Sequence, residues 1–268
     1  MRTFARHEVT VADGTTISYL DSGGAGSPVV VLHGLAGSST ELLPTAEALG
    51  GHRVVLVDQR GHGHSTRRPA DTSREAFVGD VVALLETLDR GPAVLVGQSM
   101  GAHTAMLVAA ARPDLVERLV LLECDAGSGT PQEHRRLGEF FTSWPVPFPD
   151  REAAAQFLGD SPLATAWVAD LEETPDGLNP RFDPDVLVAT IATVATPRWH
   201  EWENLQVPAV VVYAAHGMFG EAQRAEFVAR GRDVVRIDLP RGSHDAHLDA
   251  FEDWIAVLRD SLGPRRIR

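Results

Sequence analysis

Short, wholly apolar runs recur along the chain, and each is followed by a stretch in which apolar residues return at helical spacing. Runs of this kind are typical of strands that are buried on both faces of a parallel sheet. A repeated order of strand, helix and strand predicts the right-handed crossovers that build such a sheet. The apolar runs span residues 29–32, 54–57, 93–96 and 119–122, and the helical patterns between them span roughly residues 38–49, 73–89 and 100–111.

The two ends of the chain extend this sheet. Near the start, two alternating segments flank the turn signal Asp13-Gly14 and read as early strands. Near the end, two more apolar segments precede an amphipathic helix. The early strands are expected at residues 5–11 and 16–21, the late strands at residues 208–213 and 233–237, and the last helix at residues 246–262.

The alternation of strand and helix stops in the middle of the chain. Residues 128–205 contain no comparable apolar run and read as short helices interrupted by prolines. This pattern predicts a core domain made of residues 1–127 and 206–268, into which the helical segment 128–205 is inserted. The short helices are expected at roughly residues 131–142, 151–158, 161–173 and 184–195.

Composition excludes several kinds of chemistry. All 24 basic residues are arginine, so Schiff-base chemistry and the P-loop, which both need a lysine amine, are excluded. The formal net charge of −13 disfavours nucleic acid and anionic membranes as partners. With Cys124 as its one cysteine, the chain can form no internal disulfide. Because we find neither a signal-peptide core nor a membrane-spanning run, we expect a cytoplasmic protein that acts on a small molecule, in an oligomeric state that the sequence leaves open.

The strongest chemical signal is the pentapeptide Gly97-Gln98-Ser99-Met100-Gly101, which follows a predicted buried strand and opens a predicted helix. In this strand-turn-helix setting the motif G-x-S-x-G holds a serine on a tight, strained turn that exposes its hydroxyl. Glycines two residues to either side allow the neighbouring segments to pass closely. The following helix directs its N-terminus at any anion formed nearby. Ser99 is therefore the candidate nucleophile.

Two further segments make the chain resemble the α/β-hydrolase superfamily over nearly its whole length. His33-Gly34-Leu35 is similar to the H-G-x oxyanion segment of that family, and residues 58–65 are similar to its D-x-R-G-x-G-x-S loop. The resemblance implies a mostly parallel, eight-stranded α/β sheet flanked by helices. It also implies that the helical segment after the sixth strand is a cap over the active site.

The resemblance places the catalytic base after the last strand, where two histidines compete. His244 follows a Gly-Ser turn at the end of that strand, where the family carries its base. His247 lies three residues later, at the start of the last helix. We therefore favour His244 as the residue that takes the proton of Ser99.

The position of the acid departs from the pattern of many family members. They carry an aspartate after the seventh strand, where this chain has Gly217. Two carboxylates, Glu123 and Asp125, instead end the sixth strand, where haloalkane dehalogenases and their relatives place the acid. A glutamate directly after four apolar strand residues needs a buried partner, which a histidine would supply. We favour Glu123 as the acid, with Asp125 as the alternative.

The resemblance also assigns roles that leave little trace in the sequence. It implies an oxyanion hole made by the backbone N–H groups of Leu35 and Met100. Because caps close over the pocket, some cap or loop side chains should contact the substrate; the candidates are Phe141, Trp144, Met218 and Phe219. The histidines match no metal-binding motif, and we expect neither a metal nor a cofactor.

These residues predict acyl transfer. Ser99 would attack a carbonyl, and water would resolve the acyl-enzyme, so an ester, lactone or thioester of a small to medium apolar compound is the expected substrate. A serine at this turn argues against dehalogenase and epoxide hydrolase chemistry, which use aspartate there. Two alternatives stay open: a receptor-like protein that binds a ligand without turnover, and a C–C hydrolase or lyase that uses the same residues.

Overall fold

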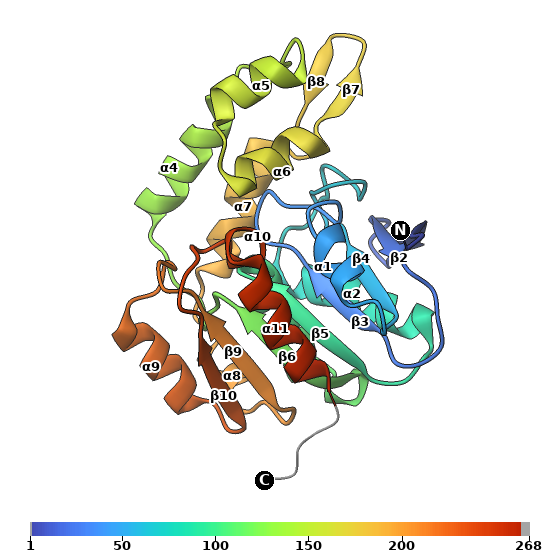
Figure 1. Ribbon diagram of the computed structural model, residues 1–268, viewed down its shortest axis with the longest axis vertical. Helices are drawn as coiled ribbons and strands as arrows, with labels where there is room; N and C mark the ends of the chain where they lie inside the picture. The colour runs from blue at the N-terminus through green and yellow to red at the C-terminus, as the bar shows by residue number, and fades with distance from the viewer. Residues whose placement is uncertain (1, 264–268) are drawn as a thin grey trace.

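The computed structural model describes residues 2–263, and its centre is a twisted sheet of eight strands in the order β1-β2-β4-β3-β5-β6-β9-β10. β2 runs antiparallel to both of its neighbours, and all the pairs from β4 to β10 are parallel (Figure 1). The strands are β1 (Ala5–Thr10), β2 (Thr16–Asp21), β3 (Val29–Leu32), β4 (Val54–Val57), β5 (Ala93–Gln98), β6 (Val116–Leu122), β9 (Ala209–Tyr213) and β10 (Val234–Asp238). The predicted fold class is confirmed.

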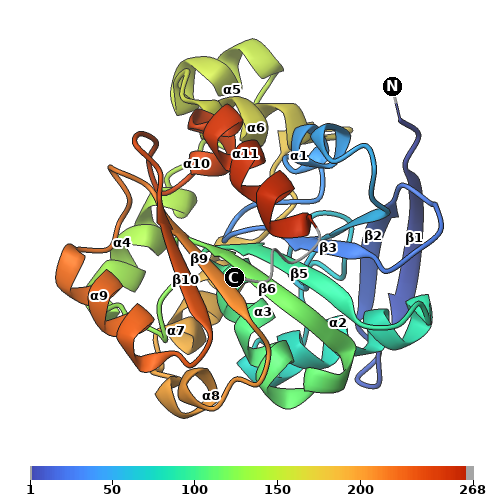
Figure 2. The same cartoon turned by 60° about the horizontal axis from the view of Figure 1, so that its bottom comes forward.

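The central strands are buried on both faces, as their unbroken apolar runs predict. Every residue of β3, β4 and β5 is buried. Side chains alternate along each strand and divide the core into two layers, one on each face of the sheet. One layer packs against α2 (Arg74–Leu88), α3 (Met100–Ala111) and α9 (Glu221–Arg230), and the other packs against α1 (Leu43–Ala48), α10 (Ala246–Asp249) and α11 (Phe251–Leu262) (Figure 2).

The segment between β6 and β9 forms the short helices that the sequence predicts, together with one small hairpin. Most of it stands beyond one end of the sheet, at the top of Figure 1. The four expected helices are confirmed near their expected bounds, as α4 (Pro131–Thr142), α5 (Arg151–Leu158), α6 (Pro162–Asp170) and α7 (Pro184–Val194). The segment also contains a helix that was not expected, α8 (Trp199–Glu203), and the hairpin of β7 (Glu172–Thr174) and β8 (Gly177–Asn179) between α6 and α7.

Part of the expected insertion packs with the core. Trp202, on α8, is fully buried beside the sheet, where its ring stacks on Phe227 of α9 with centroids 4.0 Å apart. Its indole N–H donates to the carbonyl of Phe227 at 2.7 Å. The burial of an aromatic pair of this size fixes the return of the chain onto the core.

Two helices are shorter or more broken than their patterns indicate. The first helical pattern yields only the six residues of α1, since residues 38–42 form turns that precede it. The last pattern is interrupted at Ala250, whose backbone lies at φ −125° and ψ 40° between α10 and α11. Among residues 2–263, we find no helix with both the length and the apolar character that a membrane span requires.

Helix α2 offers a test of backbone strain. It ends at Asp89, an exposed residue in the left-handed region (φ 41°, ψ 53°), where glycine is unstrained. We expect Asp89→Gly to raise the free energy of unfolding by about 0.5–1 kcal/mol, because the Cβ penalty is removed. Urea denaturation measures the change. Asp89→Ala is the control and should give no such gain, since alanine keeps the Cβ.

Candidate active site

Ser99 occupies the sharp turn between β5 and α3. Its backbone lies at φ 53° and ψ −118°, a conformation that non-glycine residues rarely adopt. A Cβ atom on Gly97 would stand 2.4 Å from the nitrogen of Ala102, and one on Gly101 would stand 2.3 Å from the carbonyl oxygen of Leu32. Both glycines are therefore required for the turn, as the motif predicts.

The His33-Gly34 segment lies directly against this turn. A Cβ atom on Gly34 would stand 3.5 Å from the Cβ of Ser99 and 2.0 Å from Oε1 of Gln98, so only glycine fits. The ring of His33 is fully buried, and its Nε2 accepts the backbone N–H of Gln59 at 3.0 Å. The proton of the neutral ring is thus on Nδ1, which donates to the carbonyl of Gly34 at 2.6 Å.

This hydrogen bond sets the direction of the Leu35 N–H. In a trans peptide the C=O and the following N–H point to opposite sides. With its carbonyl held by His33, the peptide between Gly34 and Leu35 turns its N–H away from His33. His33 thus shapes the loop that carries Leu35 through its hydrogen bond to the carbonyl of Gly34.

His244 lies in the loop after β10, beside the Ser99 turn. Its backbone carbonyl accepts a 3.0 Å hydrogen bond from Nε2 of Gln98, the residue before Ser99. Its side chain is about one-quarter exposed, at 27%. The competing His247 is turned away from solvent at 2% exposure, and its Nε2 lies 3.4 Å from Oε1 of Glu41. Gln98 carries no catalytic signal in the sequence, because its role depends on a loop 146 residues away.

Glu123 faces the imidazole of His244. The two side chains meet at 3.3 Å between Oε2 and Nδ1, and the carboxylate is fully buried. Its Oε1 accepts the N–H of Ala214 at 2.8 Å, and its Oε2 accepts the N–H of Met218 at 2.9 Å. These two backbone N–H groups hold the carboxylate in place in the buried site. Glu123 sits at φ 51°, so the end of β6 bends to turn this side chain toward the loop after β9.

Gly217 explains why an acid can stand at position 123. A Cβ atom on Gly217 would lie 2.0 Å from Oε1 and 2.4 Å from Oε2 of Glu123. The carboxylate of Glu123 therefore fills the space that a side chain at position 217 would need. The glutamate after β6 and the glycine after β9 therefore depend on each other: the carboxylate of Glu123 fits only because residue 217 has no side chain.

The neighbours of Glu123 are engaged elsewhere. Oδ1 of Asp125 accepts the N–H of Gly127 at 2.9 Å and closes the turn after β6. Cys124 is buried, and its burial raises the pKa of the thiol well above the ordinary value, so it is not a thiolate at neutral pH. Of the two carboxylates that the sequence leaves open, only Glu123 is within contact distance of His244.

The loop of residues 58–65 packs against α2 and against His33. Arg60 forms a buried ion pair with Asp80 of α2, with both N···O distances at 2.6 Å. His62 packs against His33 with ring centroids 5.1 Å apart. Burial lowers the pKa of His62 to about 3, so its ring is neutral at physiological pH. These contacts tie the loop to α2 and to His33, next to the segment that precedes Leu35.

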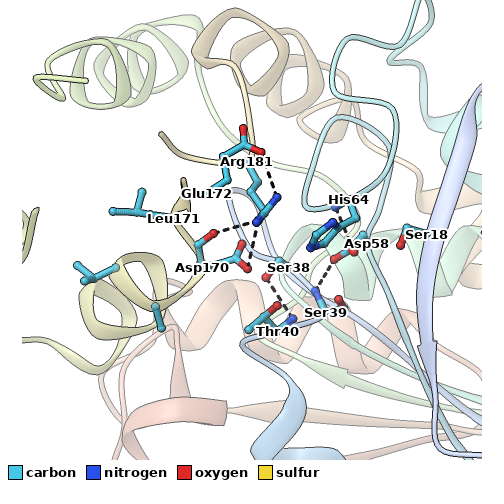
Figure 3. Close-up of polar contacts among 12 residues, drawn as sticks. Ser18, Ser38, Ser39, Thr40, Asp58, His64, Asp170, Leu171, Glu172 and Arg181 are labelled. Atoms are coloured by element: carbon cyan, nitrogen blue, oxygen red, sulfur yellow. Dashed lines mark hydrogen bonds and ion pairs between the residues drawn. The ribbon is translucent and has the colours of Figure 1, made fainter. Parts of the chain in front are cut away.

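The segment after Leu35 is held from the side of α6 and the β7–β8 hairpin (Figure 3). Ala36 adopts φ 59°, and its carbonyl accepts the indole N–H of Trp167 at 3.0 Å. Asp170, at the end of α6, is bonded to Ser38 and Thr40, and its burial raises the pKa of its carboxyl. The sequence gives no signal for these contacts, because they join segments about 130 residues apart.

Arg181 also belongs to this polar cluster, where it contacts Asp170 and Glu172. Its Nη1 donates to Glu172 at 3.1 Å and its Nε to the carbonyl of Asp170 at 3.1 Å (Figure 3). Beside it lies a cavity of about 10 Å³, the size of one water molecule. The cavity is lined by Ala36, Gly37, Gly63, Trp144, Trp167, Asp170, Leu171, Pro180, Arg181 and Phe182.

The four residues expected to contact substrate lie in different surroundings. Phe141 and Trp144 are buried at the end of α4, within an aromatic cluster that also contains Trp167 and abuts Ala36. Met218 is 63% exposed. Phe219 is buried in the main core, where it meets Tyr213 edge-on at 6.1 Å. Substrate contact at these positions stays a prediction.

Within residues 2–263, we find no group of three or more histidine, cysteine, aspartate or glutamate side chains placed to hold a metal ion. The candidate groups near the Ser99 turn are the serine itself, the pair of His244 and Glu123 in contact at 3.3 Å, and the backbone of the His33-Gly34 segment. Such a set can carry out acyl transfer to and from a serine hydroxyl.

Comparison with known proteins identifies the family of this chain. The profile of the alpha/beta hydrolase fold family matches residues 27–165. The sn-1-specific diacylglycerol lipase ABHD11 of Mus musculus is 41% identical over 251 residues, which cover 87% of this chain and 80% of that protein.

Two solved structures share the fold over nearly the whole chain. The crystal structure of E-2-(acetamidomethylene)succinate hydrolase superposes with a TM-score of 0.88 at 21% identity and covers 96% of this chain and 98% of its own. The enol-lactonase from Burkholderia xenovorans LB400 gives 0.78 at 24% identity, with coverage of 96% and 99%. At these identities the likeness shows the fold. Together with the match to the family profile and the mouse relative, the comparisons show that this chain belongs to the α/β-hydrolase family.

Proposed function

We propose that this protein is a serine hydrolase that cleaves an ester, lactone or thioester of a small to medium apolar substrate through the triad Ser99, His244 and Glu123. The observation that carries the proposal is the fit between Glu123 and Gly217. The buried carboxylate lies 3.3 Å from His244 and occupies the space left open by the glycine. A buried glutamate with no role in the chemistry would be a costly feature to keep in this position.

In the proposed reaction, the hydroxyl of Ser99 attacks the carbonyl carbon while His244 takes its proton. Glu123 holds the ring of His244 in the required tautomer and stabilises its positive charge. The N–H groups of Leu35 and Met100 donate to the oxyanion of the tetrahedral intermediate. His244 then protonates the leaving alcohol or thiol, and a water molecule, activated by His244, hydrolyses the acyl-enzyme.

Two features support the proposed substrate, one its apolar character and the other its ester-type bond. The aromatic cluster of Phe141, Trp144 and Trp167 lies against Ala36, next to the proposed oxyanion donor. Relatives and structural neighbours are named as a diacylglycerol lipase, an esterase and an enol-lactonase, all of which act on ester-type bonds. We therefore place this protein with the ester-acting members of its family.

A fluorophosphonate probe tests the proposal directly. We expect it to label the folded protein at one serine, and Ser99→Ala to abolish labelling and lower kcat by about 10⁶-fold. Mass spectrometry locates the label, and Ser143→Ala, at an exposed serine on α4, is the matched control that should retain it. Esters of p-nitrophenol with graded acyl chains, with a lactone and a thioester panel beside them, then define the substrate.

Two outcomes would contradict the proposal. An unlabelled wild-type protein that hydrolyses none of the panel would favour a ligand-binding protein without turnover. Substantial activity in Ser99→Ala would favour a lyase that uses His244 as its base.

A further inference from the structure

Gln59 connects the two segments that carry the proposed oxyanion donors. On one side its backbone N–H donates to Nε2 of His33 at 3.0 Å, and its side-chain Nε2 donates to the backbone carbonyl of His33 at 2.7 Å. On the other side its Oε1 accepts the hydroxyl of Thr104 on helix α3 at 2.9 Å. His33 precedes Leu35 by two residues, and Thr104 lies one helical turn after Met100.

The hydrogen-bond pattern leaves one arrangement for this amide. The carbonyl of His33 can only accept, so the nitrogen of Gln59 must face it and the oxygen must face Thr104. The hydroxyl of Thr104 accepts a hydrogen bond from Nη2 of Arg74, and it shares its own proton between Oε1 of Gln59 and the carbonyl of Met100, each at 2.9 Å. All four side chains are at most 2% exposed. In such surroundings each polar group depends on its partner, since water cannot replace it.

These contacts end at two backbone carbonyls next to the donors, those of Gly34 and Met100. His33, held by Gln59, donates from Nδ1 to the carbonyl of Gly34 and thereby directs the N–H of Leu35. Thr104 also lies 2.9 Å from the carbonyl of Met100, in the first turn of α3. The amide of Gln59 is thus the direct bridge between the Leu35 segment and the Met100 segment.

We propose that Gln59 and Thr104 are positioning residues for the oxyanion hole, which fix the separation of the Leu35 and Met100 N–H groups. Neither touches the reacting atoms. This inference rests on the proposed function, because it assigns a purpose to the spacing of the two donors. An oxyanion hole acts through preorganised donors, so a small loosening should weaken binding of the transition state more than binding of the substrate.

The test removes the hydroxyl of Thr104 and keeps its shape. We expect Thr104→Val to lower kcat on a p-nitrophenyl ester about 10-fold with KM changed less than twofold, since the donors are displaced but present. The inhibition constant of a trifluoromethyl ketone, which forms an oxyanion on the serine, should rise by the same factor. Thr104→Ser keeps the hydroxyl and should remain within about twofold of wild type in all three quantities.

Two further variants keep the test decisive if Thr104→Val folds poorly. Gln59→Met removes the amide at similar volume and should give the same split between kcat and KM. The double variant should be no worse than the more impaired single variant, because both substitutions break one connection. The matched control is Thr190→Val in α7, at a buried threonine whose hydroxyl has no protein partner among the described residues, and it should leave kcat unchanged.

Three results would overturn the inference. The first is an unchanged kcat in both Thr104→Val and Gln59→Met. The second is a rise in KM in these variants with kcat unchanged. The third is a loss of kcat in Thr104→Ser that equals the loss in Thr104→Val. All are measured on a wild-type enzyme that the fluorophosphonate probe labels. Failure of the positioning role therefore leaves the proposed function standing, whereas absence of labelling in the wild type removes the proposed function itself.

Discussion

Moving the acid from residue 123 to residue 217 is expected to rescue an otherwise inactive enzyme. Glu123→Gly alone should lower kcat by about 10⁴-fold, as loss of the triad acid does elsewhere, because His244 loses the group that orients and stabilises it. Glycine is unstrained at the φ of 51° found there, so the backbone should keep its path. In that background Gly217→Asp places a carboxyl where the carboxylate of Glu123 stood, and we expect it to restore kcat by at least about 10-fold.

The effect of Gly217→Asp on kcat should change sign with the residue at position 123. A purely structural role for Glu123 would not produce this change. In the wild-type background Gly217→Asp should be harmful, since its Cβ would lie 2.0 Å from Oε1 of Glu123 and would add a second buried carboxylate. Steady-state kinetics on a p-nitrophenyl ester, with thermal unfolding to confirm the fold, compares the wild type with Glu123→Gly, Gly217→Asp and the double variant. Asp125→Asn is the matched control, because it can still accept the N–H of Gly127, and it should change kcat little. A greater loss in Asp125→Asn than in Glu123→Gly would assign the acid to Asp125.

The ion pair between Arg60 and Asp80 is expected to dominate the stability of the loop that braces the site. Their side chains are 2% and 4% exposed and are joined by two hydrogen bonds of 2.6 Å. Arg60→Met should lower the free energy of unfolding by about 3–5 kcal/mol, because it leaves the buried charge of Asp80 without its partner. Asp80→Leu should cost less, since Arg60 keeps an ion pair with Asp13 at 3.0 Å. Urea denaturation followed by tryptophan fluorescence measures the change.

The double variant separates the cost of an orphaned charge from the value of the pair. Arg60→Met with Asp80→Leu buries no uncompensated charge of the pair and should be more stable than Arg60→Met alone. Arg112→Met is the control, since Arg112 forms ion pairs with Glu86 and Asp114 at the surface, and it should cost at most about 1 kcal/mol. A double variant as unstable as the sum of the singles would show that packing, and not charge, makes this contact important.

Local sequence was sufficient for the elements and for the nucleophile. The apolar runs at 29–32 and 54–57 predict strands buried on both faces, and they are β3 and β4 with the expected bounds. The glycines around Ser99 could be understood in the same way, since a strand-to-helix turn requires them within five residues. These features depend on residues that are close in the chain. They can therefore be predicted from the order of residues in the sequence.

The acid and the supports of the site depended on neighbours that are distant in the chain. The sequence left Glu123 and Asp125 open as candidates for the acid, and the fold brings Glu123 to 3.3 Å from His244, which lies 121 residues later in the chain. Gln59, Thr104 and Trp167 carry no local signal, because a buried hydrogen bond is recognised only when both partners are in place. What the sequence determined by itself was the order of elements and the turn of Ser99. Which polar side chains meet at that turn was decided by the tertiary structure, since the parallel sheet brings the ends of β3, β5, β6 and β9 to one edge.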